Sequence, residues 1–262
     1  LIAGIGIAFV SLLAPAFGDM NIDVVVDGLN NPWEMVFAPN GDIYFSERDG
    51  RIWKIESFGE AKVIQTFPKS GSYEGGTLGL ALHPNFEENN KIYVYQTNLE
   101  LEFFQNKVFS FTVDGDELTD KQTVIDGIPG APWHDGGRIA FGPDDKLYIT
   151  TGDAVNPGWS QDLSSLAGKI LRINPDGSIP DDNPFDSSPI FSYGHRNPQG
   201  IAWSNDGLLV SSEHGPSGEM GYGHDEINVI EKGKNYGWPK VVGDSSDDSF
   251  VNPIIHSGQT TW

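Results

Sequence analysis

The chain has 262 residues, which is enough for one large β-domain or two ordinary domains. It contains 37 acidic residues against 16 Lys and Arg, giving a formal net charge of −21, and it has no cysteine. This balance argues against a nucleic-acid partner, which needs clustered basic side chains, and it leaves no thiol for a disulfide or a metal.

An apolar run opens the sequence, from Leu1 to Leu13, and Ala-Pro-Ala follows at 14–16. This order is typical of the hydrophobic core and cleavage zone of a secretory signal. Because no basic segment precedes the run, we interpret residues 1–18 as a partial signal peptide or, alternatively, an N-terminal anchor. The run is shorter than the about 20 residues of a spanning helix. We therefore expect a secreted, periplasmic or extracellular protein without a stable transmembrane domain.

The remaining residues, 19–262, repeat one pattern of short apolar segments separated by turn residues such as Asn-Gly and Asp-Gly. Equivalent apolar positions recur roughly every 45 to 62 residues; they are Phe37, Leu82, Phe141 and Trp203. One antiparallel unit cannot bury both of its faces, but radial stacking of several units can. We therefore predict an all-β fold, a β-propeller of which about four blades are present, in preference to a sandwich.

Two loops early in the chain place reactive side chains beside glycines, where a ligand can approach the backbone closely. Glu74 precedes Gly75-Gly76, and it is a candidate polar contact at the mouth of the central channel. His134 precedes another Gly pair in "HDGGR", and Asp153 ends the following strand. If these strands form a hairpin, Asp153 orients one ring nitrogen of His134 and leaves the other free as a base. A simple loop hydrogen bond is the alternative.

Two later loops are also candidates. Arg196, which clusters with His195 and Asn197 in "GHRNP", offers a guanidinium fork for a carboxylate or a developing oxyanion, unless it only pairs with a surface acid. The glycine-rich stretch 212–228 ends in Asp225-Glu226, and carbonyl and carboxylate oxygens of this kind suit Ca²⁺. The histidines of this stretch lack a third close ligand, so a transition-metal site is disfavoured.

Five ordered segments resemble the PQQ-dependent sugar dehydrogenases, the glucose/sorbosone or aldose sugar dehydrogenase family. They are "EGGTLGLALHPNF", "HDGGRIAFGPDDKLYITTGD", "GKILRINPDGSIPDDNPF", "GHRNPQGIAW" and "SEHG…DEINVIEKGKNYGWP". The resemblance implies a six-bladed propeller in the full-length parent, with pyrroloquinoline quinone (PQQ) at the channel mouth. It also implies oxidation of an aldose at C1 to its lactone and an external electron acceptor.

The resemblance assigns roles residue by residue. His134 would take the proton from the sugar hydroxyl, with Asp153 orienting it and Arg196 assisting catalysis. The PQQ contacts would be Glu74, His134, Arg196 and Asn197. The Ca²⁺ ligands would be Gly215 and Pro216 beside the quinone, and Glu226 and Tyr236 at a second, structural site.

Two other functions stay open from the sequence. A calcium-binding propeller can act as a non-enzymatic interaction domain, and a calcium-dependent sugar lactonase can use the same scaffold. A lactonase needs a carboxylate cage in the channel, which the "HDGGR" and "GHRNP" segments do not supply. The family's later PQQ-binding Lys and Arg lie beyond this chain, so we expect activity from the full-length parent.

Overall fold

The computed structural model describes residues 23–57, 59–68, 73–217 and 223–261. The segment expected to be a signal peptide or anchor, 1–18, lies outside the described residues. Within the described ranges, we find no helix with the length and apolar character needed to cross a membrane.

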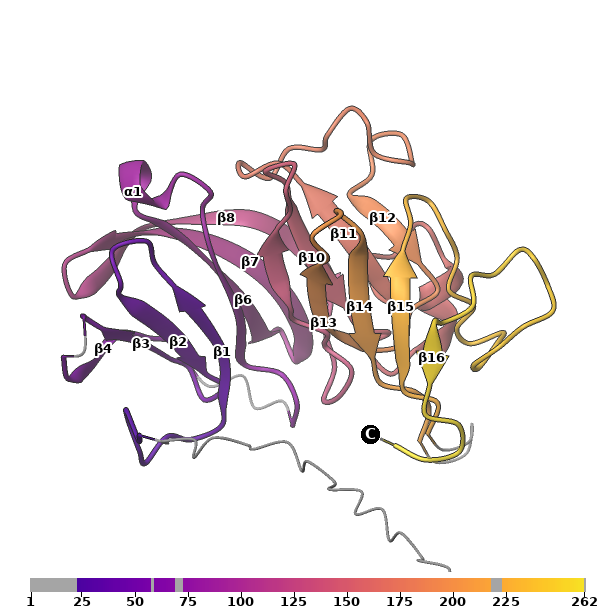
Figure 1. The fold of residues 1–262 in the computed structure, drawn as a ribbon, viewed down its shortest axis with the longest axis horizontal. Helices are drawn as coiled ribbons and strands as arrows, with labels where there is room; N and C mark the ends of the chain where they lie inside the picture. Colours follow the sequence, from indigo (N-terminus) through magenta and orange to yellow (C-terminus); the bar gives the residue numbers. More distant parts are fainter. Residues whose placement is uncertain (1–22, 58, 69–72, 218–222, 262) are drawn as a thin grey trace, which may run out of the picture.

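Four antiparallel sheets of four strands each follow one another along the chain (Figure 1). Blade 1 comprises β1 (Pro32–Phe37), β2 (Ile43–Glu47), β3 (Arg51–Ile55) and β4 (Ala61–Thr66). Blade 2 comprises β5 (Thr77–Leu82), β6 (Lys91–Glu100), β7 (Phe103–Asp114) and β8 (Glu117–Pro129), with a short helix α1 (Phe86–Asn89) between its first two strands. Blade 3 comprises β9 (Ile139–Phe141), β10 (Leu147–Thr151), β11 (Lys169–Ile173) and β12 (Ile190–Tyr193), with a 3₁₀ turn η1 at Pro157–Gln161. Blade 4 comprises β13 (Pro198–Trp203), β14 (Leu209–Glu213), β15 (Glu226–Ile230) and β16 (Ile255–His256).

Each sheet is a simple meander, in which every strand pairs with the next one in sequence. The first strands of all four blades line a common central hollow of about 670 Å³. This arrangement confirms the prediction of an all-β propeller with four blades in the present chain. The repeat could be found from sequence because each copy has the same alternation of apolar residues and turn residues.

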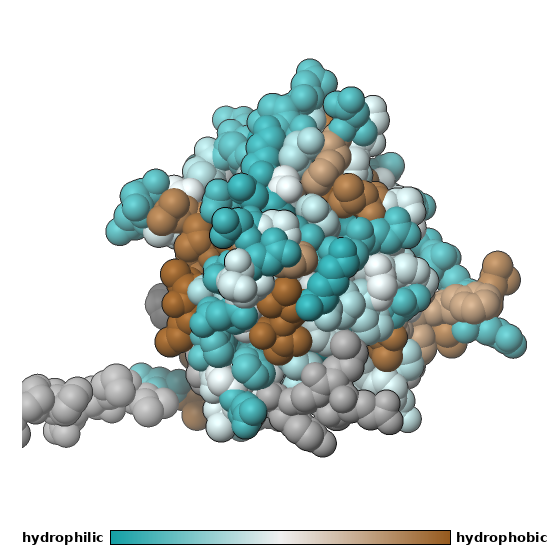
Figure 2. All heavy atoms as spheres, turned by 90° about the vertical axis from the view of Figure 1, so that its right-hand side faces the viewer, coloured by the Kyte–Doolittle hydropathy of each residue, from teal (hydrophilic) through white to brown (hydrophobic). Residues whose placement is uncertain are grey.

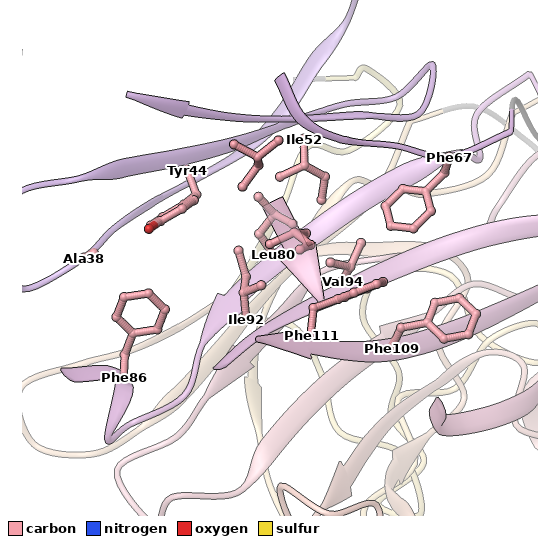
Figure 3. Packing of buried hydrophobic residues seen from close by; sticks show 12 residues of the cluster. Ala38, Tyr44, Ile52, Phe67, Leu80, Phe86, Ile92, Val94, Phe109 and Phe111 are labelled. Atoms are coloured by element: carbon pink, nitrogen blue, oxygen red, sulfur yellow. The ribbon is translucent and has the colours of Figure 1, made fainter. Parts of the chain in front are cut away.

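Neighbouring blades pack against each other through the apolar side chains of their facing sheets. Figure 3 shows Tyr44, Ile52 and Phe67 of blade 1 opposite Leu80, Ile92 and Phe111 of blade 2. A second cluster joins blade 2 to blade 3 through buried residues such as Tyr93, Ile139 and Leu171. Each fully buried Leu, Ile or Phe contributes about 1.5–3 kcal/mol, so blade-to-blade packing is the main support of the sheets. Seen from the side of blade 4, the surface is mainly hydrophilic with separate hydrophobic patches, as the acidic composition leads one to expect (Figure 2).

Blade topology brings distant loops to one end of the molecule. In a meander, the connections between blades and the connections between second and third strands leave the sheets at the same end. The loops carrying Glu74, His134 and Arg196 are of the first kind, and those carrying Asp153 and Gly215 are of the second. The predicted site residues therefore gather at one mouth of the central hollow, although up to about 140 residues separate them in sequence.

Candidate active site

His134 lies between a carboxylate and a guanidinium. Its Nδ1 is 2.7 Å from Oδ1 of Asp153, and its Nε2 is 2.9 Å from Nη2 of Arg196. A guanidinium can only donate, so Nε2 accepts and the proton of the neutral ring sits on Nδ1, where it is donated to Asp153. The contact with Asp153 is the one that the sequence analysis expected, but Nε2 is not free, because it accepts from Arg196. The role of His134 as a base stays a prediction.

The backbone around His134 is shaped to present this ring. His134 itself has φ +63°, in the left-handed region that non-glycine residues seldom adopt. Gly136 follows with φ +65°, and a Cβ there would strike the backbone of Thr150 and Thr151. Loop 134–137 therefore lies directly on the end of β10, which places His134 next to Asp153. The Gly pair noted in the sequence serves this close approach.

Asp153 is fully buried, and each of its two carboxylate oxygens accepts hydrogen bonds. Oδ1 also accepts from the backbone N–H of Val155 at 2.9 Å, and Oδ2 accepts from Nε1 of Trp238 at 2.8 Å. These contacts fix the carboxylate, so it can hold His134 in a single ring orientation. Trp238 was missed by the sequence analysis, because its place in "NYGWP" does not show that the chain folds back onto Asp153.

Arg196 contacts both His134 and the loop that begins at His214. Its guanidinium lies 5.5 Å from the centre of the Trp238 ring and donates from Nη1 to the carbonyl of His214 at 3.4 Å. Burial lowers the pKa of Arg196, while the nearby carboxylates of Asp153 and Glu213 oppose that shift. The side chain remains a cation, because no protein environment removes the guanidinium proton at neutral pH.

A pocket of about 200 Å³ opens at this cluster. Its lining residues are His134, Asp153, Val155, Pro157, Arg196, Pro216, Ser217 and Trp238. The arrangement combines a neutral base, a fixed cation and aromatic and aliphatic walls, which is the composition of a small-molecule site.

Lys169 holds the segment that carries Val155 and Pro157. The side chain is fully buried, and Nζ donates to the carbonyls of Trp159, Ser160 and Ala167 at 2.6–3.2 Å. Burial lowers the pKa of Lys169 to about 7. The three hydrogen bonds of Lys169 therefore hold together the loop that connects β10 and β11.

Two of the predicted cofactor contacts support the His134 loop. Oε2 of Glu74 accepts from the backbone N–H of His134 at 2.9 Å. Oδ1 of Asn197 accepts from the N–H of Gly136 at 3.0 Å, and Asn197 is buried. The structure thus brings both residues to the site, where these oxygens bind the protein backbone. Their contact with a quinone stays a prediction.

The four predicted calcium residues line one small recess together with Glu213. Glu213 faces Glu226 directly across β14 and β15. Burial raises the pKa of Glu226 to about 7, and the negative charge of Glu213 adds to the rise. Oδ1 of the adjacent buried Asn228 has no hydrogen-bond partner among the described residues.

The chemistry of this recess suits a bound cation. Like charges directly opposite each other on paired strands repel, and a divalent cation would remove that repulsion. Carboxylate, amide and carbonyl oxygens are the ligands that Ca²⁺ prefers. Among the described residues, this recess included, no group of three or more His, Asp or Glu is placed to hold a metal ion, so carbonyl and amide oxygens would have to supply the remaining ligands.

The fold and the site together define a propeller enzyme scaffold with an oriented histidine at the channel mouth. The model of the glucose/sorbosone dehydrogenase family matches residues 29–257, and the chain belongs to that family. This finding confirms the resemblance seen in the five sequence segments.

Three relatives illustrate the similarity. Quinoprotein glucose dehydrogenase B of Acinetobacter calcoaceticus is 34% identical over 263 residues, which cover 87% of this chain and 54% of that protein. Aldose sugar dehydrogenase YliI of Escherichia coli K12 is 34% identical over 260 residues, covering 93% and 68%. The PQQ-bound aldose sugar dehydrogenase of Streptomyces coelicolor has a similar structure, with a TM-score of 0.82, 40% identity, and coverage of 90% and 70%. The chain therefore spans little more than half the length of the first of these relatives.

Proposed function

We propose that the protein oxidises the C1 hydroxyl of an aldose to a lactone, with PQQ as cofactor and Ca²⁺ as its partner ion. The observation that carries the proposal is the His134 ring, held by Asp153 through Nδ1 while its basic Nε2 faces a pocket beside Arg196. Family membership and the quinoprotein relatives support the choice of substrate class and cofactor. The six-bladed ring of the full-length parent belongs to the same proposal.

His134 acts as the general base. A sugar O1–H that enters the pocket donates to Nε2 in place of Arg196, and the proton moves from O1 to that nitrogen as C1 becomes a carbonyl carbon. Asp153 accepts from Nδ1 throughout and stabilises the imidazolium that forms. General-base assistance of this kind contributes about 10²–10⁴-fold to the rate.

Bound PQQ would supply the two-electron acceptor for the hydride that leaves C1. Arg196, once released from Nε2, would hold its positive charge beside the bound cofactor and would stabilise negative charge there. Glu74 and Asn197 would complete the contacts, and an external electron acceptor would return the cofactor to its oxidised state.

Calcium would bind at the recess that Arg196 helps to line. Gly215 and Pro216 would offer carbonyl oxygens on the side of the pocket, and Glu226 and Tyr236 would serve the structural site. The apolar N-terminal run is consistent with export, which would give the protein access to periplasmic or extracellular sugars and calcium.

Reconstitution of the complete natural protein tests this function. With PQQ and Ca²⁺ added, we expect reduction of an acceptor dye by aldoses and formation of the lactone, with loss of turnover when either addition is omitted. Lactone hydrolysis without PQQ would instead identify a lactonase. Tight binding of a ligand without any turnover would identify an interaction domain.

A further inference from the structure

The second and third strands of blade 2 are longer than the strands of the other blades (Figure 1). β6 and β7 have 10 and 12 residues, whereas no strand of blades 1, 3 and 4 has more than six. β5 begins opposite Gln96 and β8 ends opposite Gln105, so the last two pairs of the β6–β7 hairpin have no third strand beside them. Residues 98–104 therefore form a two-stranded arm, whose tip extends about 13 Å beyond Gln96.

The arm presents three large apolar side chains to solvent. Leu99, Leu101 and Phe103 are 56%, 93% and 73% exposed, and Leu101 is the most exposed large hydrophobic side chain among the described residues. Single exposed apolar residues are common on protein surfaces, but three of them within five residues of a projecting hairpin are typical of an interaction surface.

The turn at the tip contains residues that do not favour its shape. Glu100 pairs with Phe103, so Leu101 and Glu102 are the two central residues of the turn, and their φ angles are +49° and +71°. A turn with two positive φ angles favours Asn-Gly, because other side chains are strained there. The chain thus keeps an exposed leucine at the tip although another sequence would fold more readily, which favours a role in binding over a role in folding.

The arm lies at the same end of the molecule as the His134 pocket. It is a connection between second and third strands, the kind of connection that also carries part of the site in blade 3. The carbonyl of Phe104 accepts from the N–H of Gly130 at 3.1 Å. Nδ2 of Asn106 donates to Oδ1 of Asp135 at 3.1 Å. The base of the arm is therefore bonded to both sides of the loop that carries His134, so a partner held by the arm would lie at this end of the propeller.

The charge around the arm restricts the kind of partner. Glu102 at the tip and Asp126 on β8 are exposed, and the chain as a whole has a net charge of −21. Lys107 of β7 lies 2.8 Å from Glu100, so its positive charge is already offset. Such a surface repels a second copy of this chain and an anionic membrane, and it attracts a basic protein.

We propose that the arm, residues 98–104, is the docking element for a basic protein that accepts the electrons of the reaction. The apolar tip contacts an apolar patch on that protein, and the acidic surroundings attract its positive charges. Each aldose oxidised to its lactone releases two electrons and two protons, so two one-electron acceptors are reduced per turnover. The proposal rests on the proposed function, which requires an external acceptor and leaves its binding surface open.

The test compares a protein acceptor with a small dye, using the complete protein reconstituted with PQQ and Ca²⁺ and supplied with glucose. Cytochrome c, a basic redox protein, is the probe. In the double variant Leu101→Asn, Glu102→Gly we expect the KM for cytochrome c to rise about tenfold, because a buried leucine contact is lost. Turnover with the dye should change less than twofold, and the melting temperature should stay the same or rise, because Asn-Gly suits the turn.

Leu208→Asn is the matched control. Leu208 is 48% exposed and precedes β14 in the connection from β13, at the opposite end of the molecule, so its replacement should leave the KM for cytochrome c unchanged. An unchanged KM for cytochrome c in the double variant would overturn the proposal, and so would equal losses with cytochrome c and the dye. A wild type that reduces the dye but not cytochrome c would overturn it as well.

Direct binding separates this proposal from the proposed function. If the wild type oxidises no aldose with the dye, the proposed function fails, whereas calorimetric titration with cytochrome c still decides the docking. We expect the double variant to bind cytochrome c about tenfold more weakly than the wild type does. A wild-type dimer that the double variant loses would overturn the proposal in favour of a second copy. Binding to phosphatidylcholine vesicles that the double variant loses would overturn it in favour of a membrane surface.

Discussion

Two histidine–carboxylate pairs lie near each other and use the same local geometry. His134 Nδ1 is 2.7 Å from Asp153, and His195 Nδ1 is 2.8 Å from Glu213. Both carboxylates are buried. The pairs differ in what lies on the second ring nitrogen, and from this difference we infer that His134 is the base of the proposed reaction and His195 a structural residue.

The second nitrogen of His195 points into the protein. Nε2 is 2.8 Å from Oγ of Ser192, and the ring stacks on Tyr236 with centres 4.7 Å apart, so the side chain has no exposed surface. The His134 side chain is 18% exposed, and its Nε2 faces the pocket. A hydrogen-bonded carboxylate orients a histidine in either setting, but only access to a ligand makes it a base.

Removal of the His134 ring should have the largest effect on activity. In His134→Ala we expect kcat to fall by about 10²–10⁴-fold, because the proton acceptor for O1 is lost. Steady-state dye reduction by the reconstituted protein measures this, and PQQ binding and the melting temperature serve as controls for folding. Near wild-type turnover would show that His134 is not the base.

Replacement of the orienting carboxylate should have the next largest effect. Asp153→Asn keeps the shape of the side chain but no longer stabilises the imidazolium and can turn its amide toward Nδ1. We expect kcat to fall within the range of about 10²–10⁴-fold that general-base assistance contributes, with little change in KM. A rise in KM with an unchanged kcat would contradict an orienting role.

Replacement of the histidine in the second pair should affect stability instead of turnover. His195→Asn leaves Glu213 and Ser192 with unmet hydrogen bonds in a buried site, which costs about 1–3 kcal/mol in the free energy of unfolding. Chemical denaturation measures this loss, and kcat at 25 °C should stay within a fewfold of wild type. A loss of kcat as large as that of His134→Ala would erase the distinction between the two pairs.

The smallest expected effect on activity is that of Lys169, whose substitution should change the pH dependence of stability rather than turnover. Lys169 bonds the carbonyl of Ser160, whose hydroxyl in turn donates to the carbonyl of His195. Because burial lowers the pKa of Lys169 to about 7, the unfolded chain binds a proton between pH 7 and about 10 that the folded protein lacks.

The stability of the wild type relative to Lys169→Met should therefore rise with pH across this window, by at most about 1.4 kcal/mol per pH unit. Thermal or denaturant unfolding of both proteins at pH 7, 8 and 9 measures the difference, and the comparison cancels the titration of other groups. A difference that does not change with pH would mean that the three carbonyls keep the ammonium protonated.

The sequence by itself determined the blade repeat and indicated which loops meet around the candidate site. Regular alternation of apolar residues and turn residues depends on neighbours in the chain, so the four blades could be predicted from it. The Gly pairs after Glu74 and His134 also pointed to close approaches of the backbone, because glycine has a local conformational reason to be there.

The tertiary structure decided which histidine is accessible and which groups complete the site. His134 and His195 both have a nearby acid, and nothing local in the sequence shows that Ser192 and Tyr236 bury one of them. Trp238 reaches Asp153 across 85 residues, and Glu213 meets Glu226 only because β14 and β15 pair in that register. Such contacts depend on how blades stack and strands align, and these are properties of the whole fold rather than of any one segment.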